Sequence, residues 1–222
     1  MISIIVPTLN EASAIERTLA SLQELQGEKE ILVVDGGSTD DTTTLAQQRG
    51  VRVLPGARGR GTQLHAGALQ SRGDVLWFVH ADTLPPRHAL QEIVAALRDP
   101  KVLAGNFALQ FEGGSRAARQ LTAIYPTLRC LNLCYGDSGI FVRREAYERI
   151  GGFRALALFE DLDLLKRLRR AGCFVHLPCA IVTSSRRFEN RNFALMWAHW
   201  TALQVLYWAG VPPNVLARWY RR

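Results

Sequence analysis

The sequence predicts an α/β fold: a single domain with a mostly parallel central sheet flanked by helices, followed by an apolar helical segment at the carboxyl end. Short β-branched runs alternate with helical patterns through residues 1–100, which is the pattern of successive βαβ units. The chain has 222 residues, of which 48% are hydrophobic and 21% are charged. This length suits one domain, and this composition supplies a sizeable buried core.

The expected elements alternate along the chain. Strands are expected at residues 2–6, 31–34, 51–54, 75–79, 102–111 and 139–143. Helices are expected at residues 11–25, 40–48, 62–70, 87–98 and 145–150, with a helical insertion at 113–135. One face of the first helix carries Ile15, Leu19 and Leu22. The helix at 87–98 is expected to pack through Leu90, Ile93, Val94 and Leu97.

The charge of the chain favours an anionic partner. The formal net charge is +7 and the isoelectric point is near 9.7. A nucleotide diphosphate, an acidic lipid headgroup and a nucleic acid all fit this charge. The arginines are scattered and form no nucleic-acid reading motif, so no nucleic-acid partner is expected.

Neither the cysteines nor the amino terminus indicates a secreted or zinc-stabilised protein. Cys130, Cys134, Cys173 and Cys179 lack the paired spacing of a zinc site, so they are expected to be buried, reduced thiols. The opening residues lack the basic region and cleavage site of a secretory signal. We therefore expect the protein in the cytoplasm or at the inner face of the membrane.

Polar side chains follow three of the expected strands. They are Pro-Thr-Leu-Asn-Glu at 7–11, Asp-Gly-Gly-Ser-Thr-Asp at 35–40 and His-Ala-Asp-Thr at 80–83. In open α/β sheets, ligands bind outside the carboxyl ends of the strands. Taken singly, the first two segments also match helix caps.

Taken together, the three segments resemble family-2 glycosyltransferases, and the resemblance covers nearly the whole chain. In that family the opening reads close to residues 3–11 here, and the second strand reads close to residues 31–35 followed by Gly-Ser-Thr-Asp. The resemblance implies a GT-A-like (Rossmann-like) domain that moves a sugar, as a hexosyltransferase does, from a nucleotide-diphosphate donor to an acceptor hydroxyl. It also implies metal-assisted single displacement with inversion.

The resemblance also assigns a nucleotide pocket. By analogy, Pro7, Thr8, Glu11 and Asp35 line it, and Asp35 accepts a hydrogen bond from the base. The family usually has a pair of aspartates at this point, whereas this chain has Asp35 followed by Gly36. Within the family, the chain looks most similar to the group linked to arsenosugar biosynthesis.

A divalent metal, Mn²⁺ or Mg²⁺, is implied by residues 80–82. The Asp-x-Asp motif of the family is represented by His80-Ala81-Asp82, which keeps only the final acid. Asp82 supplies the hard oxygen ligand that such a cation needs. His80 is either a nitrogen ligand, which manganese accepts more readily than magnesium, or a residue that positions Asp82.

A glycine-rich loop at 55–62 runs into a helix. Its backbone amides, with Arg58 and Arg60, could hold phosphate oxygens. It is not a Walker loop, because Thr62 stands where lysine is required. A simple surface turn is the competing interpretation.

The acceptor side is indicated by Gly-Gly-Phe at 151–153 and Glu-Asp-Leu-Asp at 160–163, which resemble a pair of acceptor-site motifs in the family. By that resemblance, Gly152 and Glu160 contact substrate. On a helical wheel Asp161 lies within the stripe of Leu164, Leu165 and Leu168, whereas Asp163 lies opposite. Asp161 is therefore the candidate general base, with a helix-start carboxylate as the alternative. Asp137 either binds a hydroxyl or caps a turn.

The carboxyl end differs in character from the rest of the chain. Residues 192–210 are apolar with no broad polar face, and arginines flank them at 186, 187, 191, 218, 221 and 222. We expect a domain at 1–185 and a helical extension at 186–222. The extension either covers the acceptor pocket or makes peripheral membrane contact through residues 192–222, which would suit a lipid-like rather than another small-molecule acceptor. A full membrane span is less expected, because His199 and Gln204 interrupt the stretch.

Two other functions share the predicted fold. A sugar-phosphate nucleotidyltransferase usually carries a basic, glycine-rich loop directly after the first strand, where this chain has residues 7–11. A nucleotide-binding regulator without catalysis would need no special role for Asp161.

Overall fold

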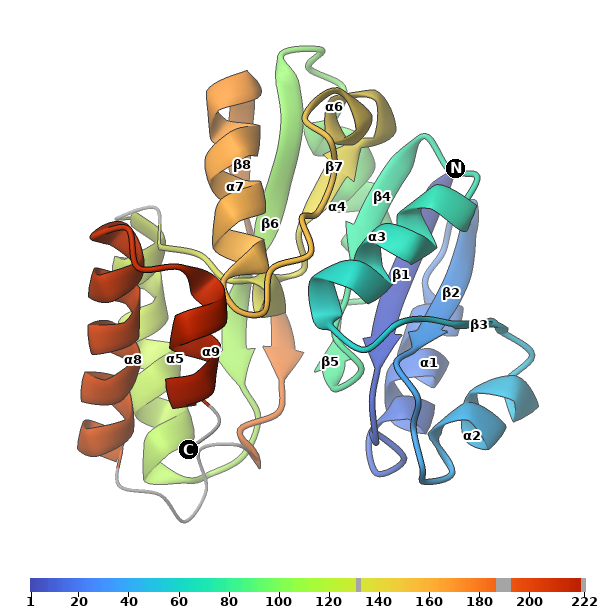
Figure 1. Ribbon diagram of the computed structural model, residues 1–222. Coiled ribbons are helices and arrows are strands. Elements are labelled where there is room, and N and C mark those ends of the chain that lie inside the picture. The colour runs from blue at the N-terminus through green and yellow to red at the C-terminus, as the bar shows by residue number, and fades with distance from the viewer. Residues whose placement is uncertain (131–132, 187–192, 221–222) are drawn as a thin grey trace.

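The computed structural model describes residues 1–130, 133–186 and 193–220, and it contains one eight-stranded sheet with helices on both faces (Figure 1). The strands are β1 (Ile2–Thr8), β2 (Lys29–Asp35), β3 (Arg52–Pro55), β4 (Val75–Phe78), β5 (Thr83–Leu84), β6 (Val102–Phe111), β7 (Phe141–Arg143) and β8 (Cys173–Thr183). Their order across the sheet is β3-β2-β1-β4-β7-β6-β8-β5. Only β7 and β5 run antiparallel to their neighbours, so the prediction of a mostly parallel sheet is confirmed.

The helices follow the strands in the expected alternation. They are α1 (Ile15–Glu24), α2 (Thr42–Gln48), α3 (Arg60–Gln70), α4 (Ala89–Ala96), α5 (Arg116–Cys130), α6 (Arg144–Arg149), α7 (Glu160–Ala171), α8 (Phe193–Trp208) and α9 (Pro213–Tyr220), with a 3₁₀ turn, η1 (Gly136–Ser138). Each expected helix is found, although α1 begins at Ile15 and not at residue 11. Part of the insertion expected at 113–135, residues 131–132, lies outside the described residues.

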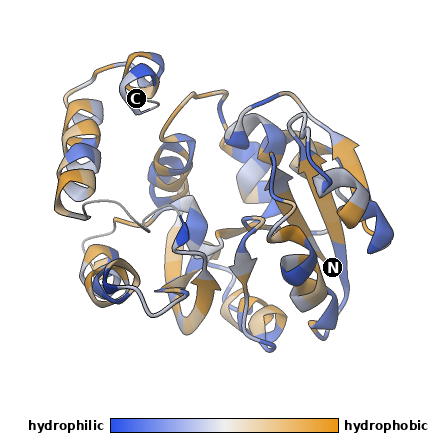
Figure 2. Ribbon diagram, turned by 90° about the horizontal axis from the view of Figure 1, so that it is seen from below, coloured by the Kyte–Doolittle hydropathy of each residue, from blue (hydrophilic) through white to orange (hydrophobic). Residues whose placement is uncertain are grey.

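Alternating side chains of the strands build a core on each face of the sheet. In β1, Ile4 and Val6 pack with α1 and α4 on one face, whereas Ile5 packs with α3 and α7 on the other. All three side chains are fully buried. Figure 2 shows the hydrophobic strands between the flanking helices. Apolar burial on both faces is the main stabilising force for such a sheet.

Two expectations about the fold were wrong, and one strand was not predicted. Val94 is 51% exposed and does not belong to the packed face of α4. Cys130 and Cys173 are exposed, and only Cys134 is fully buried, although all four cysteines are free thiols. The long strand β8 was not predicted: Pro178 and register shifts against β6 interrupt its pattern, and its burial does not alternate regularly.

The carboxyl-terminal helices pack together. α8 contacts α9, and Figure 1 shows both on the opposite side of the molecule from β3. Of the flanking arginines, 187, 191, 221 and 222 lie outside the described residues, as does residue 192. Within the part of the chain that the structure describes, no helix has the length and apolar character needed to cross a membrane.

Candidate functional site

The ends of β1 and β2 lie side by side, because Thr8 pairs with Asp35 in the register of the sheet. Asp35 is buried, and its carboxylate accepts hydrogen bonds from the Thr8 hydroxyl at 3.0 Å and from the backbone amides of Gly37 and Ser38 at 2.9 and 2.8 Å. Burial disfavours the charged form, but the hydrogen bonds from Ser38, Gly37 and Thr8 outweigh it and lower the pKa of Asp35. Asp35 therefore anchors the loop that follows β2.

The missing second aspartate has a steric explanation. The buried side chain of Gln63 donates hydrogen bonds to the carbonyl oxygens of Thr8 and Val34, both at 2.8 Å, and so ties the two strand ends together. A β-carbon on Gly36 would lie only 3.0 Å from the Gln63 amide nitrogen. A larger residue at position 36 would displace this amide, so Gly36 and Gln63 fit as a pair.

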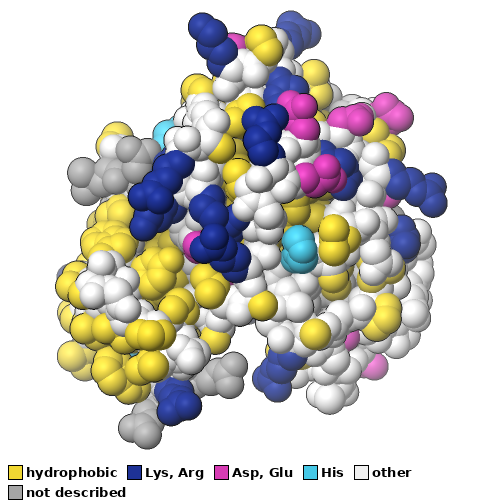
Figure 3. All heavy atoms as spheres, turned by 45° about the horizontal axis from the view of Figure 1, so that its top comes forward, with side chains coloured by type: hydrophobic (Ala, Val, Ile, Leu, Met, Phe, Trp, Pro, Cys, Tyr) yellow, Lys and Arg dark blue, Asp and Glu magenta, His cyan; other side chains and the backbone are white. Residues whose placement is uncertain are grey.

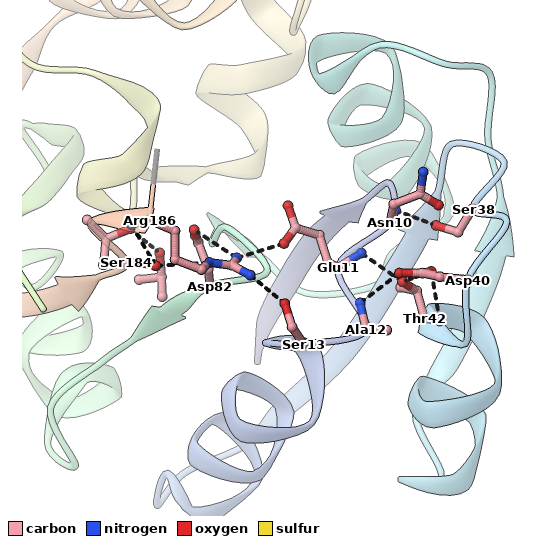
Figure 4. A network of polar contacts seen from close by, with 12 residues as sticks. Asn10, Glu11, Ala12, Ser13, Ser38, Asp40, Thr42, Asp82, Ser184 and Arg186 are labelled. Atoms are coloured by element: carbon pink, nitrogen blue, oxygen red, sulfur yellow. Dashed lines mark hydrogen bonds and ion pairs between the residues drawn. The ribbon is translucent and has the colours of Figure 1, made fainter. Parts of the chain in front are cut away.

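The segments after β1 and β4 meet through an arginine from the end of β8. Arg186 Nη2 lies 3.0 Å from Glu11 Oε2 and 3.5 Å from Asp82 Oδ2, and its Nη1 donates to the Ser13 hydroxyl at 2.5 Å (Figure 4). Ser184 accepts a further hydrogen bond from Arg186 Nε at 3.0 Å. A pocket of about 320 Å³ is lined by Ser13, Arg17, Asp82, Glu112, Ser184 and Arg186, among others.

A second charged cluster forms where α3 meets the start of α7. Arg60 Nε donates to the buried Glu160 carboxylate, and Arg60 Nη2 lies 3.7 Å from Asp161 Oδ2. Asp161 is 6% exposed, and it accepts a 2.7 Å hydrogen bond from the backbone amide of Gly136. Burial raises the pKa of Glu160 although Arg60 opposes this shift. Asp161 thus faces inward, as the wheel predicted, and it has partners there.

Asp137 connects the two clusters. Its Oδ1 atom is buried and, within the described residues, has no hydrogen-bond partner. Burial and the charge of Asp161 raise the pKa of Asp137 to about 7, against the opposing charge of Arg60 and with a further contribution from Asp82. Asp137 therefore lies within electrostatic range of both Asp161 and Asp82.

This shift predicts a pH-dependent stability. The folded state holds the Asp137 proton up to about pH 7, whereas the unfolded state releases it near pH 3.8. Stability that is present below pH 4 is therefore lost as the pH rises to 7. Asp137→Asn removes this loss, so the variant should gain roughly 4 kcal/mol relative to wild type between pH 4 and pH 8. Urea unfolding in EDTA across this range measures the difference, and a constant difference would contradict the shift.

Asp163 does not face solvent, which corrects the helical-wheel prediction. It is 9% exposed, and its carboxylate pairs with Arg167 Nη2 at 2.6 Å and with Arg154 Nη1 at 3.3 Å. Arg167 is one turn further along α7 and forms an ion pair with Asp163. Asp163 is therefore buried although it lies on the side of the helix that the wheel marks as polar.

The remaining candidate residues are placed as follows. Pro7 is a buried member of β1, and Arg58 is exposed in the loop before α3. Gly152 has a φ of +62°, and a β-carbon there would lie 2.7 Å from His65 and 2.8 Å from Tyr147. The structure thus gives Gly152 a packing role. Substrate contact by these residues stays a prediction.

His80 lies beside Gly136, at the start of η1. A β-carbon on Gly136 would lie 3.4 Å from His80 Nε2 and 3.3 Å from Asp161 Oδ2. In residues 1–130, 133–186 and 193–220, no three His, Cys, Asp or Glu side chains gather closely enough to hold a metal ion. A cation held by Asp82 would therefore need ligands from a bound molecule as well.

Sequence reasoning missed one contribution to this site and left a second as one of two alternatives. Arg186 follows a strand that was not predicted, so nothing in the sequence pointed to its contact with Asp82. α8 supplies the other: Gln204 Oε1 accepts a 2.7 Å hydrogen bond from the Tyr135 hydroxyl, and the Tyr207 ring lies 4.9 Å from the Phe159 ring. Tyr135 and Phe159 directly precede the segments that carry Asp137 and Asp161. The absence of a polar face on residues 192–210 was the only sequence feature that indicated this role of α8.

The sequence matches known proteins over most of its length. The family model described as "Glycosyl transferase family 2" matches residues 3–155. A beta-monoglucosyldiacylglycerol synthase of Synechocystis sp. is 25% identical over all of this chain and 58% of its own length. A pre-mycofactocin glycosyltransferase of Mycobacterium tuberculosis is 26% identical over 96% of this chain and 47% of its own length. The chain thus spans about half the length of these curated relatives.

Solved structures share the fold. A mannosyltransferase from Pyrobaculum calidifontis, in complex with GDP-Man and Mn²⁺, has a TM-score of 0.72 and 24% identity over 92% of this chain and 61% of its own. Glucosyl-3-phosphoglycerate synthase from Mycobacterium tuberculosis, in complex with Mn²⁺, UDP and glucosyl-3-phosphoglycerate, has a TM-score of 0.68 and 23% identity over 96% of this chain and 81% of its own. The expected GT-A-like fold is confirmed, whereas the arsenosugar subgroup stays a prediction.

Proposed function

Since this chain belongs to glycosyl transferase family 2, we propose that it transfers a sugar from a nucleotide-diphosphate donor to an acceptor hydroxyl, with a divalent metal and with inversion. The observation that supports this most is that Glu11 and Asp82, which follow the carboxyl ends of β1 and β4, share Arg186, while Asp137 lies within electrostatic range of both Asp82 and Asp161. Ligands of open α/β sheets bind at such ends. The two solved relatives carry GDP-Man or UDP at this kind of fold.

The donor would lie on the β1–β2 side. Asp35 already accepts hydrogen bonds from Thr8, Gly37 and Ser38. We therefore propose that Asp35 holds the loop that frames the nucleotide. Its carboxylate would also accept a hydrogen bond from the base. Glu11 is 21% exposed in its side chain, and it pairs with Arg186, which lines the pocket together with Asp82. The diphosphate would then extend from this loop toward Asp82.

The residues at Asp82 fit a divalent metal. The carboxylates of Asp82 and Glu11 converge on a cationic group, the Arg186 guanidinium, which shows that the place stabilises positive charge (Figure 4). Magnesium and related hard cations are commonly bound by one or two carboxylates together with substrate phosphates. When bound, the metal would neutralise charge that develops on the departing nucleoside diphosphate. Asp82 would hold the cation. With His80 as a second ligand, manganese would bind better than magnesium, because it accepts an imidazole nitrogen more readily.

Asp161 would act as the base toward the acceptor. The Gly136 amide and Arg60 hold its carboxylate inward, and Glu160 shares the same arginine. In the proposed step, the acceptor oxygen bonds to the anomeric carbon, the bond from that carbon to the diphosphate oxygen breaks, and Asp161 accepts the hydroxyl proton. Attack from the face opposite the leaving group gives inversion, and Arg60 orients Asp161 for it.

A ligand screen tests this function. In the presence of Mn²⁺, one nucleotide sugar or nucleoside diphosphate should raise the melting temperature by about 5–10 °C at a hundredfold excess over its Kd. The same ligand with EDTA should raise it far less. Turnover should then release nucleoside diphosphate only when an acceptor is present. Pyrophosphate release would indicate nucleotidyl transfer, and failure of every nucleotide sugar to bind would contradict the proposal.

We further propose that residues 193–220 cover the acceptor side with one face and contact an anionic membrane with the other. Gln204 and Leu203 of α8 are buried, whereas Leu195, Val205 and Trp208 are 52–70% exposed. α9 adds Trp219 and Tyr220 at 46% and 42%. Figure 3 shows hydrophobic side chains gathered on this side of the molecule. Exposed tryptophans beside arginines are typical of interfacial helices, and a lipid-like acceptor would suit such contact.

Vesicle sedimentation tests the membrane contact. The protein should bind vesicles that contain phosphatidylglycerol more tightly than phosphatidylcholine vesicles. Trp208→Glu should weaken this binding by about tenfold or more, because a charge replaces a large apolar side chain. Leu69→Glu is a matched control, since Leu69 is 68% exposed on α3, away from α8. Equal binding by wild type and Trp208→Glu would contradict the proposal.

A further inference from the structure

Arg186 holds the position beside Asp82 where a cation is needed. Its guanidinium bridges Glu11 at 3.0 Å and Asp82 at 3.5 Å, and Ser13 and Ser184 orient it through hydrogen bonds (Figure 4). The donor-free protein thus neutralises these carboxylates with its own side chain.

A divalent cation that binds Asp82 therefore competes with Arg186. Like charges within a few ångströms repel each other, so the guanidinium must leave the Asp82 carboxylate before the cation can approach. We propose that Arg186 is a placeholder for the metal: it weakens cation binding while no donor is present, and it thereby couples metal binding to donor binding. This inference rests on the proposed function, because it takes Asp82 as the metal ligand.

The diphosphate of the donor removes the conflict. Its oxygens offer Arg186 a new anionic partner, and a guanidinium pairs well with phosphate oxygens. The diphosphate oxygens would also coordinate the cation, and so supply ligands that Asp82 alone does not provide. The two binding events must then help each other by the same factor, as linkage requires. Arg186 is in this sense a positioning residue of the donor site.

The size of the effect follows from the exposure of Arg186. Its side chain is 44% exposed, and exposed ion pairs contribute little, since solvent screens them. Removing the guanidinium should therefore tighten the binding of Mn²⁺ alone by about 3- to 10-fold.

Arg17 provides a matched control. It lines the same pocket and pairs with Glu112 at 2.6 Å, so Arg17→Gln removes the same charge from the same pocket. No ion pair joins Arg17 to Asp82 among the described residues. A general electrostatic effect would appear in Arg17→Gln, whereas the placeholder effect would appear only in Arg186→Gln.

Titration of the full chain with Mn²⁺, followed by the paramagnetic resonance of the free ion, tests the inference. Without nucleotide, Arg186→Gln should lower the Kd for Mn²⁺ by about 3- to 10-fold, Arg17→Gln by less than about twofold, and Arg186→Lys, which keeps the charge, should stay close to wild type. With saturating UDP or GDP, whichever binds, the advantage of Arg186→Gln should disappear.

Two results would overturn the inference. One is an unchanged or raised Kd in Arg186→Gln, including no measurable Mn²⁺ binding by either protein. The other is an equal gain in Arg17→Gln. These outcomes are distinguishable from failure of the proposed function, because that function fails when no nucleotide sugar is bound or turned over, whereas the titration with Mn²⁺ alone needs neither.

Discussion

Asp161→Asn should lower kcat by about 10³- to 10⁴-fold and leave donor binding within about twofold of wild type. The substitution keeps the shape of the side chain and an oxygen for the Gly136 amide, but it removes the group that accepts the acceptor proton. General-base catalysis contributes factors of this size, and a base that acts only in the chemical step changes kcat and not donor affinity. Steady-state transfer rates and donor thermal shifts measure the two effects separately.

Asp163→Asn is the control for this change. Asp163 is two residues further along α7 and is as deeply buried as Asp161, but its partners are Arg154 and Arg167. Its loss should cost stability and leave kcat of the folded protein within about fivefold of wild type, since it touches no reacting group. Retention of more than about a tenth of the activity in Asp161→Asn, or equal losses in both variants, would contradict the role of Asp161.

Asp82→Asn should reduce kcat/KM by about 10³-fold and raise the Mn²⁺ concentration needed for half-maximal activity. Asparagine keeps the size of the side chain but loses the charge that a hard cation requires. The metal would supply several kcal/mol of stabilisation to the leaving diphosphate, so weaker binding reduces the rate most at low Mn²⁺. Activity as a function of Mn²⁺ concentration measures this loss, and excess metal should restore part of it.

Glu112→Gln is the matched control for Asp82. Glu112 lines the same pocket, but its ion-pair partner is Arg17. This variant should keep the Mn²⁺ dependence of wild type. If Asp82→Asn shows wild-type activity at every Mn²⁺ concentration, the metal does not bind Asp82.

The sequence allowed the fold and the positions of several candidate site residues to be predicted, because both depend on local patterns. Apolar runs of β-branched residues marked β1, β2, β4 and β6, and polar residues directly after a parallel strand must lie at one edge of the sheet. Asp161 was placed correctly for the same reason, since the leucines of α7 fix which face of the helix points inward.

The parts that could not be predicted depend on partners distant in the chain. Arg60 pairs with Glu160, and Arg186 pairs with Glu11, although 100 and 175 residues separate them. Asp163 is buried because Arg154 and Arg167 cover it, and a helical wheel that counts leucines does not see these partners. The placement of β8 depends on register shifts against β6, which carry no regular period. Without β8, the position of Arg186 could not be inferred.

We propose that Asp82 and Asp161 serve one reaction from two sides of a single site. A crystal structure with Mn²⁺ and the nucleoside diphosphate identified by the thermal-shift screen tests this most directly, because the anomalous signal of manganese locates the cation. We expect a manganese ion about 2.0–2.5 Å from an Asp82 oxygen, with Arg186 moved away from it and the Asp161 carboxylate facing the diphosphate end of the nucleotide. A manganese ion bound away from Asp82, or a nucleotide separated from Asp161 by packed side chains, would contradict it.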